Sequence, residues 1–227
     1  MKYPPIKILF QDDYFIAVEK PSGVFVHPME KRGLEEKNNL LKRVKEQTGH
    51  YLYPVNRIDR PVSGVVLFAL NKEATRKMQD IWKDDETKKH YLALCKGVLE
   101  NPGEFSFPLK DDNGNEKPSC TAYKPIFSFG DITLCLVQIF TGRRHQIRRH
   151  FSRRCMNLLG DTTYGKGKIN HFFRDHFGLG RIFLHSSRLE FIHPFTHEKI
   201  KIHSELSEDL KKSLKEIYLN YDGLLST

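Results

Sequence analysis

Short runs of apolar residues, many of them alternating with polar ones, recur along the chain and predict more strands than helices. The first run is IKILFQDDYFIAVEKPSG (6–23), in which we expect two short strands on either side of a polar turn at Asp12 and Asp13. Further strands are expected at GVVLFAL (64–70), KKHYLALCKGVL (88–99), TAYKPIFSF (121–129), ITLCLVQIF (132–140), GRIFLHSSRLEFIHPF (180–195) and EKIKIHS (198–204).

Two segments have the apolar spacing of an amphipathic helix. Asn71 is placed to cap a helix whose apolar face comprises Ala74, Met78, Ile81 and Trp82. The charged segment 30–49 predicts a loop and then a helix, with apolar positions at Leu34, Leu40, Leu41 and Val44. The Gly/Pro/Asn-rich stretch 101–119 predicts a flexible excursion. Because strands outnumber helices and do not alternate with them regularly, the expected class is α+β with a mostly antiparallel sheet.

Length and composition narrow the class of protein. A chain of 227 residues with 39% hydrophobic residues can bury a core, so we expect a soluble globular protein. Its cysteines have no C-x-x-C spacing, which predicts buried thiols in a reducing compartment and no zinc site. The N-terminal residues contain no long apolar segment of the kind that a signal peptide or membrane span needs, so we expect a cytoplasmic protein without a membrane partner.

The formal charge of +9 suggests an anionic partner, for which nucleic acid is the commonest candidate. Segment 143–154 holds six arginines and two histidines and no acidic residue. With Thr141 as its N-cap, a helix here would bury Ile147 and Phe151 on one face. Arginines one turn apart repel, so we expect nucleic-acid phosphates against this helix, with a merely solvated face as the alternative.

The segment VNRIDRPVSG (55–64) places one carboxylate, Asp59, between two arginines directly before an apolar run. In an extended chain Arg57 and Asp59 point the same way, while Arg60 points elsewhere. A carboxylate near a guanidinium stays ionised, which suits a nucleophile, and carboxylate nucleophiles attack sugar carbons. An ordinary Arg–Asp ion pair at the start of a strand is the alternative.

Four further motifs accompany NRIDRPVSG in a fixed order. They are EKPSG (19–23), KKHYLAL (88–94), TGRRHQIRRH (141–150) and FLHSSRLEFIHPFT (183–196). In order and spacing the set resembles the RluA family of pseudouridine synthases, whose catalytic motif is usually written HRLDRxTSG, and the likeness extends from about residue 6 to residue 203. The combination with GDTTYGKG (160–167) is most similar to the family's tRNA-modifying branch. No S4-like RNA-binding domain is expected before ILFQDDYF (8–15).

The resemblance implies a role for individual residues. Asp59 would be the nucleophile, Tyr91 the ring that packs on a flipped uracil, and Arg148 the ion-pair partner of Asp59. The Tyr91 hydroxyl could also serve as the general base. Arg57 would enter the space that the base leaves. The other residues implied to line the base pocket or contact the RNA are Arg60, Ile147, Leu184, Arg143, Arg144, His145, Gln146 and Arg149.

The resemblance also implies the fold, the reaction and the partner. The fold would be the pseudouridine synthase catalytic fold, a mostly antiparallel mixed sheet flanked by helices, in a single domain over residues 1–227. The reaction breaks the N1–C1′ bond of uridine and joins C5 to C1′ without any oxidation, so no cofactor and no metal are expected. The expected partner is RNA, in particular tRNA near the junction of the T arm and acceptor stem, bound by a monomer without an obligate protein partner.

Two positions depart from the family's catalytic motif. Asn56 replaces the usual His, and it can form hydrogen bonds but cannot be charged. Val62 replaces the usual Thr. Two other functions stay open: a ribosomal-RNA synthase of the same family, because substrate choice lies in variable segments such as 30–49 and 101–118, and a non-catalytic RNA-binding module, which only Asn56 favours.

Overall fold

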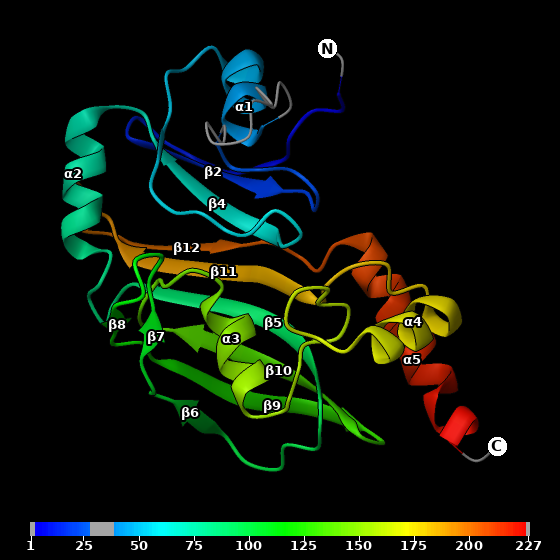
Figure 1. Ribbon diagram of the computed structural model, residues 1–227. Coiled ribbons are helices and arrows are strands. Elements are labelled where there is room, and N and C mark those ends of the chain that lie inside the picture. The colour runs from blue at the N-terminus through cyan, green and yellow to red at the C-terminus, as the bar shows by residue number, and fades with distance from the viewer. Residues whose placement is uncertain (1–2, 28–38, 226–227) are drawn as a thin grey trace. The chain divides into compact units, whose positions relative to one another are not determined.

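The computed structural model describes residues 3–27 and 39–225, with side chains as far as Tyr221. The chain forms two compact units, and most of their helices and strands are labelled in Figure 1. The first unit contains the residues up to Lys88 together with Ser186–Glu205, and the second contains Lys89–His185 and the residues from Leu206 onward. Leu34, an expected apolar helix position, lies outside the described residues. The single-domain organisation remains a prediction.

The first unit contains a sheet with the strand order β1–β2–β4–β11, in which β3 also pairs with β4 and β12 pairs with β11. The pairs β1–β2, β2–β4, β3–β4 and β11–β12 are antiparallel, as expected. The bounds are β1 (Ile8–Gln11), β2 (Phe15–Lys20), β3 (Tyr53–Pro54), β4 (Ser63–Ala69), β11 (Leu184–Ile192) and β12 (Lys199–His203).

Both helices of the first unit begin at an asparagine cap. The Asn71 side chain accepts a hydrogen bond from the Ala74 N–H at 2.8 Å, which confirms the predicted start of α2 (Lys72–Ile81). In the same way Asn39 caps α1 (Leu40–Thr48) through the Lys42 N–H. The apolar face of α2, with Ala74 and Met78 fully buried, packs in the core formed with strands β2, β4, β11 and β12.

Gly64 allows two strands of this sheet to approach closely. Its φ angle is 114°, a conformation that favours glycine, and a Cβ atom built there would lie 2.2 Å from the Ser186 carbonyl oxygen of β11. No side chain fits at that distance. The glycine that ends VNRIDRPVSG is therefore required by the packing of β4 against β11.

The second unit contains an antiparallel sheet with the strand order β5–β10–β9–β6 and a two-stranded hairpin of β7 and β8. The bounds are β5 (Lys88–Lys96), β6 (Gly103–Phe105), β7 (Leu109–Lys110), β8 (Glu116–Lys117), β9 (Thr121–Phe129) and β10 (Ile132–Ile139). The strands expected at 88–99, 121–129 and 132–140 are confirmed. The stretch 101–119, expected as an excursion without regular structure, instead contains β6, β7 and β8.

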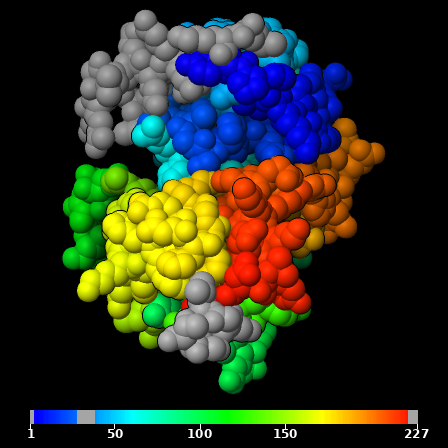
Figure 2. Space-filling model, turned by 90° about the vertical axis from the view of Figure 1, so that its right-hand side faces the viewer, coloured from blue at the N-terminus to red at the C-terminus, as the bar shows by residue number. Residues whose placement is uncertain are grey.

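Three helices belong to the second unit: α3 (Gln146–Arg153), α4 (Gly167–Phe177) and α5 (Glu208–Leu225). Figure 2 shows α4 and α5 side by side on one face. Their contact is aromatic, because Phe173 and Phe177 of α4 pack against Tyr221 of α5 in a core that also contains Leu94 and Phe183. Neither α4 nor α5 is among the helices expected from the sequence.

The four cysteines differ in burial. Cys95 and Cys135 are buried as expected, but Cys120 is only half-buried and Cys155, which follows α3, is exposed. The expectation of four buried thiols is therefore wrong, because Cys155 lies in the turn after the helix and not on its apolar face. None of the helices in the described part of the chain has the length and hydrophobicity that crossing a bilayer requires.

Candidate active site

Asp59 lies in a turn between β3 and β4 of the first unit. Its carbonyl accepts a hydrogen bond from the Val62 N–H at 3.0 Å, which closes a four-residue turn. Before the turn, Arg57 is exposed, Ile58 is buried and Asp59 is half-buried. This alternation agrees with the expectation that Arg57 and Asp59 point the same way. A short turn directly before a buried strand thus carries the candidate nucleophile.

Lys20 holds this turn from below the surface. Its side chain is fully buried, and its Nζ donates to the carbonyls of Pro21 at 2.9 Å, Val24 at 2.8 Å and Arg60 at 3.1 Å. A buried ammonium needs such a set of acceptors, because burying its charge without partners is costly. Lys20 therefore fastens EKPSG to the turn at Asp59, a role that the sequence analysis missed.

Further hydrogen bonds join the same two loops. The Gly23 N–H donates to the Arg60 carbonyl at 2.8 Å, and Arg60 Nε returns a bond to the Gly23 carbonyl at 3.0 Å. Ser22 Oγ donates to the Pro61 carbonyl at 2.9 Å. Arg60 thus has an intramolecular partner on EKPSG, and its contact with RNA remains a prediction. The two motifs form one clasped pair of loops that fixes the backbone on the C-terminal side of Asp59.

Asn56 has the positional role that its hydrogen-bonding capacity allows. Its Oδ1 accepts a bond from the Leu67 N–H at 2.8 Å, immediately after the pairing of β3 with β4. This bond holds the start of the Asp59 loop against β4. A few residues away, Arg57 Nη1 lies 3.3 Å from His27 Nε2. Burial and the positive charge of Arg57 hold the pKa of His27 below its usual value, which favours a neutral imidazole beside that guanidinium.

The remaining predicted pocket residues lie in the second unit. Tyr91 is buried in β5, where it pairs with Val137 of β10. Ile147 in α3 and Leu184 at the start of β11 are also buried, as expected of residues that line an apolar base pocket. Asp59 belongs to the first unit and Arg148 to the second, and the ion pair expected between them remains a prediction.

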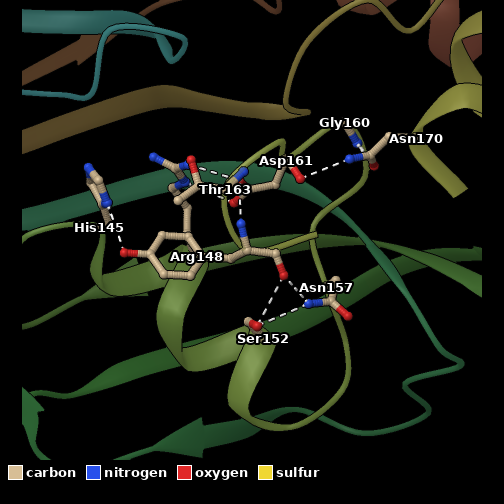
Figure 3. A network of polar contacts seen from close by, with 9 residues as sticks. His145, Arg148, Ser152, Asn157, Gly160, Asp161, Thr163 and Asn170 are labelled. Carbon is tan, nitrogen blue, oxygen red and sulfur yellow. Dashed lines mark hydrogen bonds and ion pairs between the residues drawn. The ribbon is translucent and has the colours of Figure 1, made fainter. Parts of the chain in front are cut away.

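Arg148 forms a buried ion pair with Asp161, a residue to which the sequence analysis gave no role. Arg148 Nε donates to Asp161 Oδ2 and Arg148 Nη2 to Asp161 Oδ1, both at 2.8 Å (Figure 3). The side chains are 5% and 1% exposed. Burial alone would raise the pKa of Asp161, but the hydrogen bonds and charge of Arg148, with the N–H groups of Tyr164 and Thr163, hold that pKa below its usual range. The carboxylate is therefore ionised at neutral pH.

The basic helix begins later than expected. Thr141 does not cap it, because α3 starts at Gln146 after a turn in which His145 adopts a left-handed conformation. Thr141 Oγ1 instead donates to Gln146 Oε1 at 2.7 Å, and Gln146 Nε2 donates to the Cys120 carbonyl at 2.8 Å. Gln146 thus connects the start of α3 to the loop before β9. Ile147 and Phe151 are buried on one face, as predicted.

Four arginines in and beside α3 contact the segment between β6 and β9. The contacts are Arg143 Nε to the Pro118 carbonyl (3.0 Å), Arg144 Nη1 to Asp112 Oδ1 (2.5 Å), Arg149 Nη1 to the Lys110 carbonyl (2.9 Å) and Arg153 Nη1 to the Pro108 carbonyl (3.1 Å). The sequence predicts phosphates against these side chains, whereas in the structure they also have acceptors within the chain. Their contact with RNA remains a prediction.

Sequence reasoning could have noticed one of the missed residues. Asp161 lies in GDTTYGKG, a segment quoted for its resemblance to the tRNA-modifying branch, and a buried arginine requires a carboxylate somewhere in the chain. The role of Lys20 has no comparable signal, because its acceptors are backbone carbonyls. Among the described residues, no group of three or more His, Cys, Asp or Glu side chains is placed to hold a metal ion.

Comparison with known proteins identifies the family. The model of the RNA pseudouridylate synthase family matches residues 14–153, so the chain belongs to that family. The enzymes of this class isomerise uridine within RNA, and this chain accordingly is an RNA pseudouridine synthase with RNA as its partner.

Individual relatives are similar to this chain over most of its length. The tRNA pseudouridine synthase C of Vibrio cholerae is 32% identical over 93% of this chain and 95% of its own. The tRNA pseudouridine synthase C of Pasteurella multocida is 34% identical over 87% of this chain and 90% of its own. The solved structure of human RNA pseudouridylate synthase domain containing 4 is similar with a TM-score of 0.76 at 22% identity, covering 93% of both chains, and confirms the α+β pseudouridine synthase fold.

The buried His150 ring forms hydrogen bonds to the segment before β9, and its protonation tests how that segment is held. The ring is fully buried, with Nε2 3.2 Å from the Phe107 carbonyl and Nδ1 2.9 Å from Thr121 Oγ1. Since a carbonyl can only accept, Nε2 carries the proton and the neutral ring satisfies both contacts. Burial, and secondarily the charges of Arg153 and Arg149, keep the pKa of His150 low, although the Phe107 carbonyl opposes this.

We expect this histidine to make the fold less stable in mild acid. The folded protein binds fewer protons at His150 than the unfolded chain does. The contribution of neutral His150 to stability is therefore full above about pH 6.5, and it is lost as the pH falls toward the lower pKa of the folded state. Urea unfolding at pH 7.5 and 5.5 should show a larger loss of stability for the parent than for His150→Gln. His171→Gln, at an exposed position of α4, should behave like the parent. Equal losses in the parent and His150→Gln would contradict the prediction.

Proposed function

We propose that this enzyme converts a single uridine of tRNA, near the junction of the T arm and acceptor stem, to pseudouridine. The observation that carries the proposal is the set of relatives named tRNA pseudouridine synthase C, which are 30–34% identical over most of the chain. The basic segment 143–154 supports it, because RNA phosphates are suitable partners for so many arginines.

In the proposed mechanism Asp59 is the nucleophile. The target uridine leaves the base stack, the Asp59 carboxylate forms a bond to C1′ as the N1–C1′ bond breaks, and the uracil turns so that C5 bonds to C1′ and the carboxylate is released. Finally the proton on C5 is removed and N1 gains one, so that atoms and electrons balance without a cofactor or metal. The support for Asp59 is its place in NRIDRPVSG and the clasped loops that hold its turn.

Other residues are assigned roles around the flipped nucleotide. Arg57 fills the space that the base leaves and so offsets part of the cost of unstacking, which is a few kcal/mol. Tyr91 packs on the uracil, and its hydroxyl is the candidate base that removes the proton from C5. Arg148 is the ion-pair partner of Asp59. Ile147 and Leu184 supply the apolar walls, consistent with their burial.

The same proposal includes a monomeric, cytoplasmic enzyme with one catalytic domain. The proposed mechanism requires no second protein. The other residues expected to contact the substrate, Arg60, Arg143, Arg144, His145, Gln146 and Arg149, are proposed to orient the RNA.

Mapping of pseudouridine by carbodiimide in total tRNA and rRNA tests the choice of substrate. In a strain that lacks this gene we expect one tRNA position to lose its pseudouridine while all rRNA positions keep theirs. A plasmid carrying the parent gene should restore the position, and a plasmid carrying Asp59→Asn should not. Loss of an rRNA position instead would make the protein a ribosomal-RNA synthase, and no loss at all would contradict the proposed substrate.

A further inference from the structure

Arg148 is held by two kinds of contact, hydrogen bonds and an aromatic ring. Within the plane of the guanidinium, the two parallel hydrogen bonds to Asp161 fix both its position and its rotation. The guanidinium carbon also lies over the Tyr164 ring, 5.1 Å from its centroid. A flexible side chain is thereby confined to one orientation.

Asp161 is itself immobilised by the backbone around it. Its Oδ1 also accepts bonds from the N–H groups of Thr163 at 2.9 Å and Tyr164 at 3.1 Å, and its carbonyl accepts the N–H of Gly165 at 2.9 Å. Asn170 of α4 adds two hydrogen bonds. Its Nδ2 donates to the Asp161 carbonyl, and Asn170 Oδ1 accepts from the Gly160 N–H (Figure 3). The carboxylate thus occupies a rigid loop.

The same loop is attached to α3 at two further points. The Tyr164 hydroxyl lies 3.0 Å from His145 Nδ1, just before the helix. The Tyr164 carbonyl accepts bonds from Ser152 Oγ at 3.2 Å and from Asn157 Nδ2, near the end of the helix (Figure 3). Loop 160–165 therefore follows α3 from one end to the other, with Arg148 in the middle.

Stability alone is a poor explanation for such a buried ion pair. The desolvation of two charges largely offsets their attraction, and well-packed apolar residues of the same volume often serve at least as well. What an apolar pair cannot supply is a guanidinium in a defined orientation. A catalytic group must meet the reacting atoms in one geometry, and small displacements from that geometry slow the reaction. A fixed orientation therefore favours catalysis.

We propose that Asp161 is a positioning residue that fixes the guanidinium of Arg148 in the orientation required for the isomerisation. The inference rests on the proposed catalytic role of Arg148. Asp161 contacts no reacting atom in this account. It acts only through Arg148, and Tyr164 and Asn170 act in turn by holding the loop.

The test compares Asp161→Asn with a matched variant in the same unit. Asp161→Asn keeps the size of the side chain, removes its charge and replaces one acceptor oxygen by a donor. Asp209→Asn makes the same change in another two-bond pair, in which Arg181 Nε and Nη2 donate to the Asp209 carboxylate at 2.6 and 3.1 Å. Single-turnover rates are measured on RNA from the deletion strain, which contains the unmodified target whichever RNA it is.

We expect Asp161→Asn to lower the single-turnover rate per folded molecule about 10²-fold. The RNA concentration that gives half the maximal rate should stay within about twofold, because no RNA contact is removed. Asp209→Asn should lower the melting temperature and leave the rate per folded molecule unchanged. A merely structural Asp161 would behave as Asp209 does, and that result would overturn the proposal.

A double-mutant cycle with Arg148→Lys separates this inference from the proposed function. If Asp161 acts through Arg148, adding Asp161→Asn to Arg148→Lys should slow the reaction by less than about threefold. If Arg148→Lys reacts slowly while folded Asp161→Asn reacts at the parental rate, the role of Asp161 is refuted and the role of Arg148 stands. An Arg148→Lys protein of parental rate would refute the role of Arg148 and the inference with it.

A second variant keeps the test decisive if Asp161→Asn does not fold. Asp161→Glu retains the negative charge but places the carboxylate one methylene farther out, so the guanidinium must shift. We expect a folded protein with a rate reduced by about 10-fold or more. The parental rate in folded Asp161→Glu would overturn the proposal.

Discussion

Replacing Asp59 with asparagine is expected to abolish the formation of pseudouridine while the fold and RNA binding persist. The substitution keeps the size and most of the hydrogen-bonding capacity of the side chain but removes its charge and nearly all its nucleophilicity. Removal of an enzymatic nucleophile typically costs about 10⁴-fold or more in rate. The turn itself should survive, because it is held by the backbone bond to Val62 and by Lys20 through the neighbouring Arg60 carbonyl.

Three measurements on one preparation test this prediction: the melting temperature, the affinity for RNA, and the yield of pseudouridine. Asp13→Asn is the matched control, since it removes one negative charge from an exposed position of the same unit and should leave the yield unchanged. Asp59→Ala should be as inactive as Asp59→Asn. If Asp59 served only in a structural ion pair, the variant would melt earlier but its folded fraction would still turn over, and Asp59 would not be the nucleophile.

Replacing both Arg149 and Arg153 with alanine is expected to weaken RNA binding by roughly 10- to 30-fold near physiological salt. If each side chain meets one phosphate, the slope of log affinity against log salt should also become flatter by about one to two. The structure adds a second consequence. Both side chains donate to carbonyls of the segment before β8, so their loss should speed amide hydrogen exchange in residues 107–117.

The control removes the same number of positive charges elsewhere in the second unit. Arg174→Ala with Lys215→Ala changes two exposed positions on α4 and α5 and should leave the salt slope as in the parent. An unchanged slope in the Arg149/Arg153 variant, together with faster exchange, would mean that these arginines only hold the neighbouring segment. An unchanged slope without faster exchange would contradict both roles.

The longer strands and the first two helices were predictable because local signals decide them, whereas the short strands β3, β6, β7 and β8 were not. Asn71 followed by Ala74 and Met78 at helical spacing specifies α2, and the alternation in 121–140 specifies β9 and β10. The predicted start of α3 was wrong because Thr141 has the local signal of an N-cap, a threonine just before a helical pattern. The hydroxyl of Thr141 is engaged by Gln146, which itself is directed toward Cys120, a residue distant in sequence. Tertiary contacts decided that boundary.

The candidate site was predictable only where a motif carries it. NRIDRPVSG indicates Asp59 and Arg57, but no sequence pattern indicates that Lys20 would donate to three carbonyls, since a carbonyl belongs to every residue. GDTTYGKG indicates that Asp161 is a candidate partner for a buried arginine, but its pairing with Arg148 of another motif is visible only in the structure. Asn56 shows the opposite case. The chemistry of its side chain predicts a hydrogen bond, and in the structure the Asn56 Oδ1 accepts that bond from the Leu67 N–H.

The exposed position of Cys155 makes the natural protein suitable for site-selective labelling. Cys95 and Cys135 are buried, and burial together with the nearby Glu104 raises the pKa of Cys120 to about 11, so little of that thiol is in the reactive thiolate form at neutral pH. A maleimide fluorophore should therefore attach to Cys155, directly after the arginines at the end of α3. If RNA binds along α3 as proposed, the dye would report its arrival in real time without an engineered cysteine.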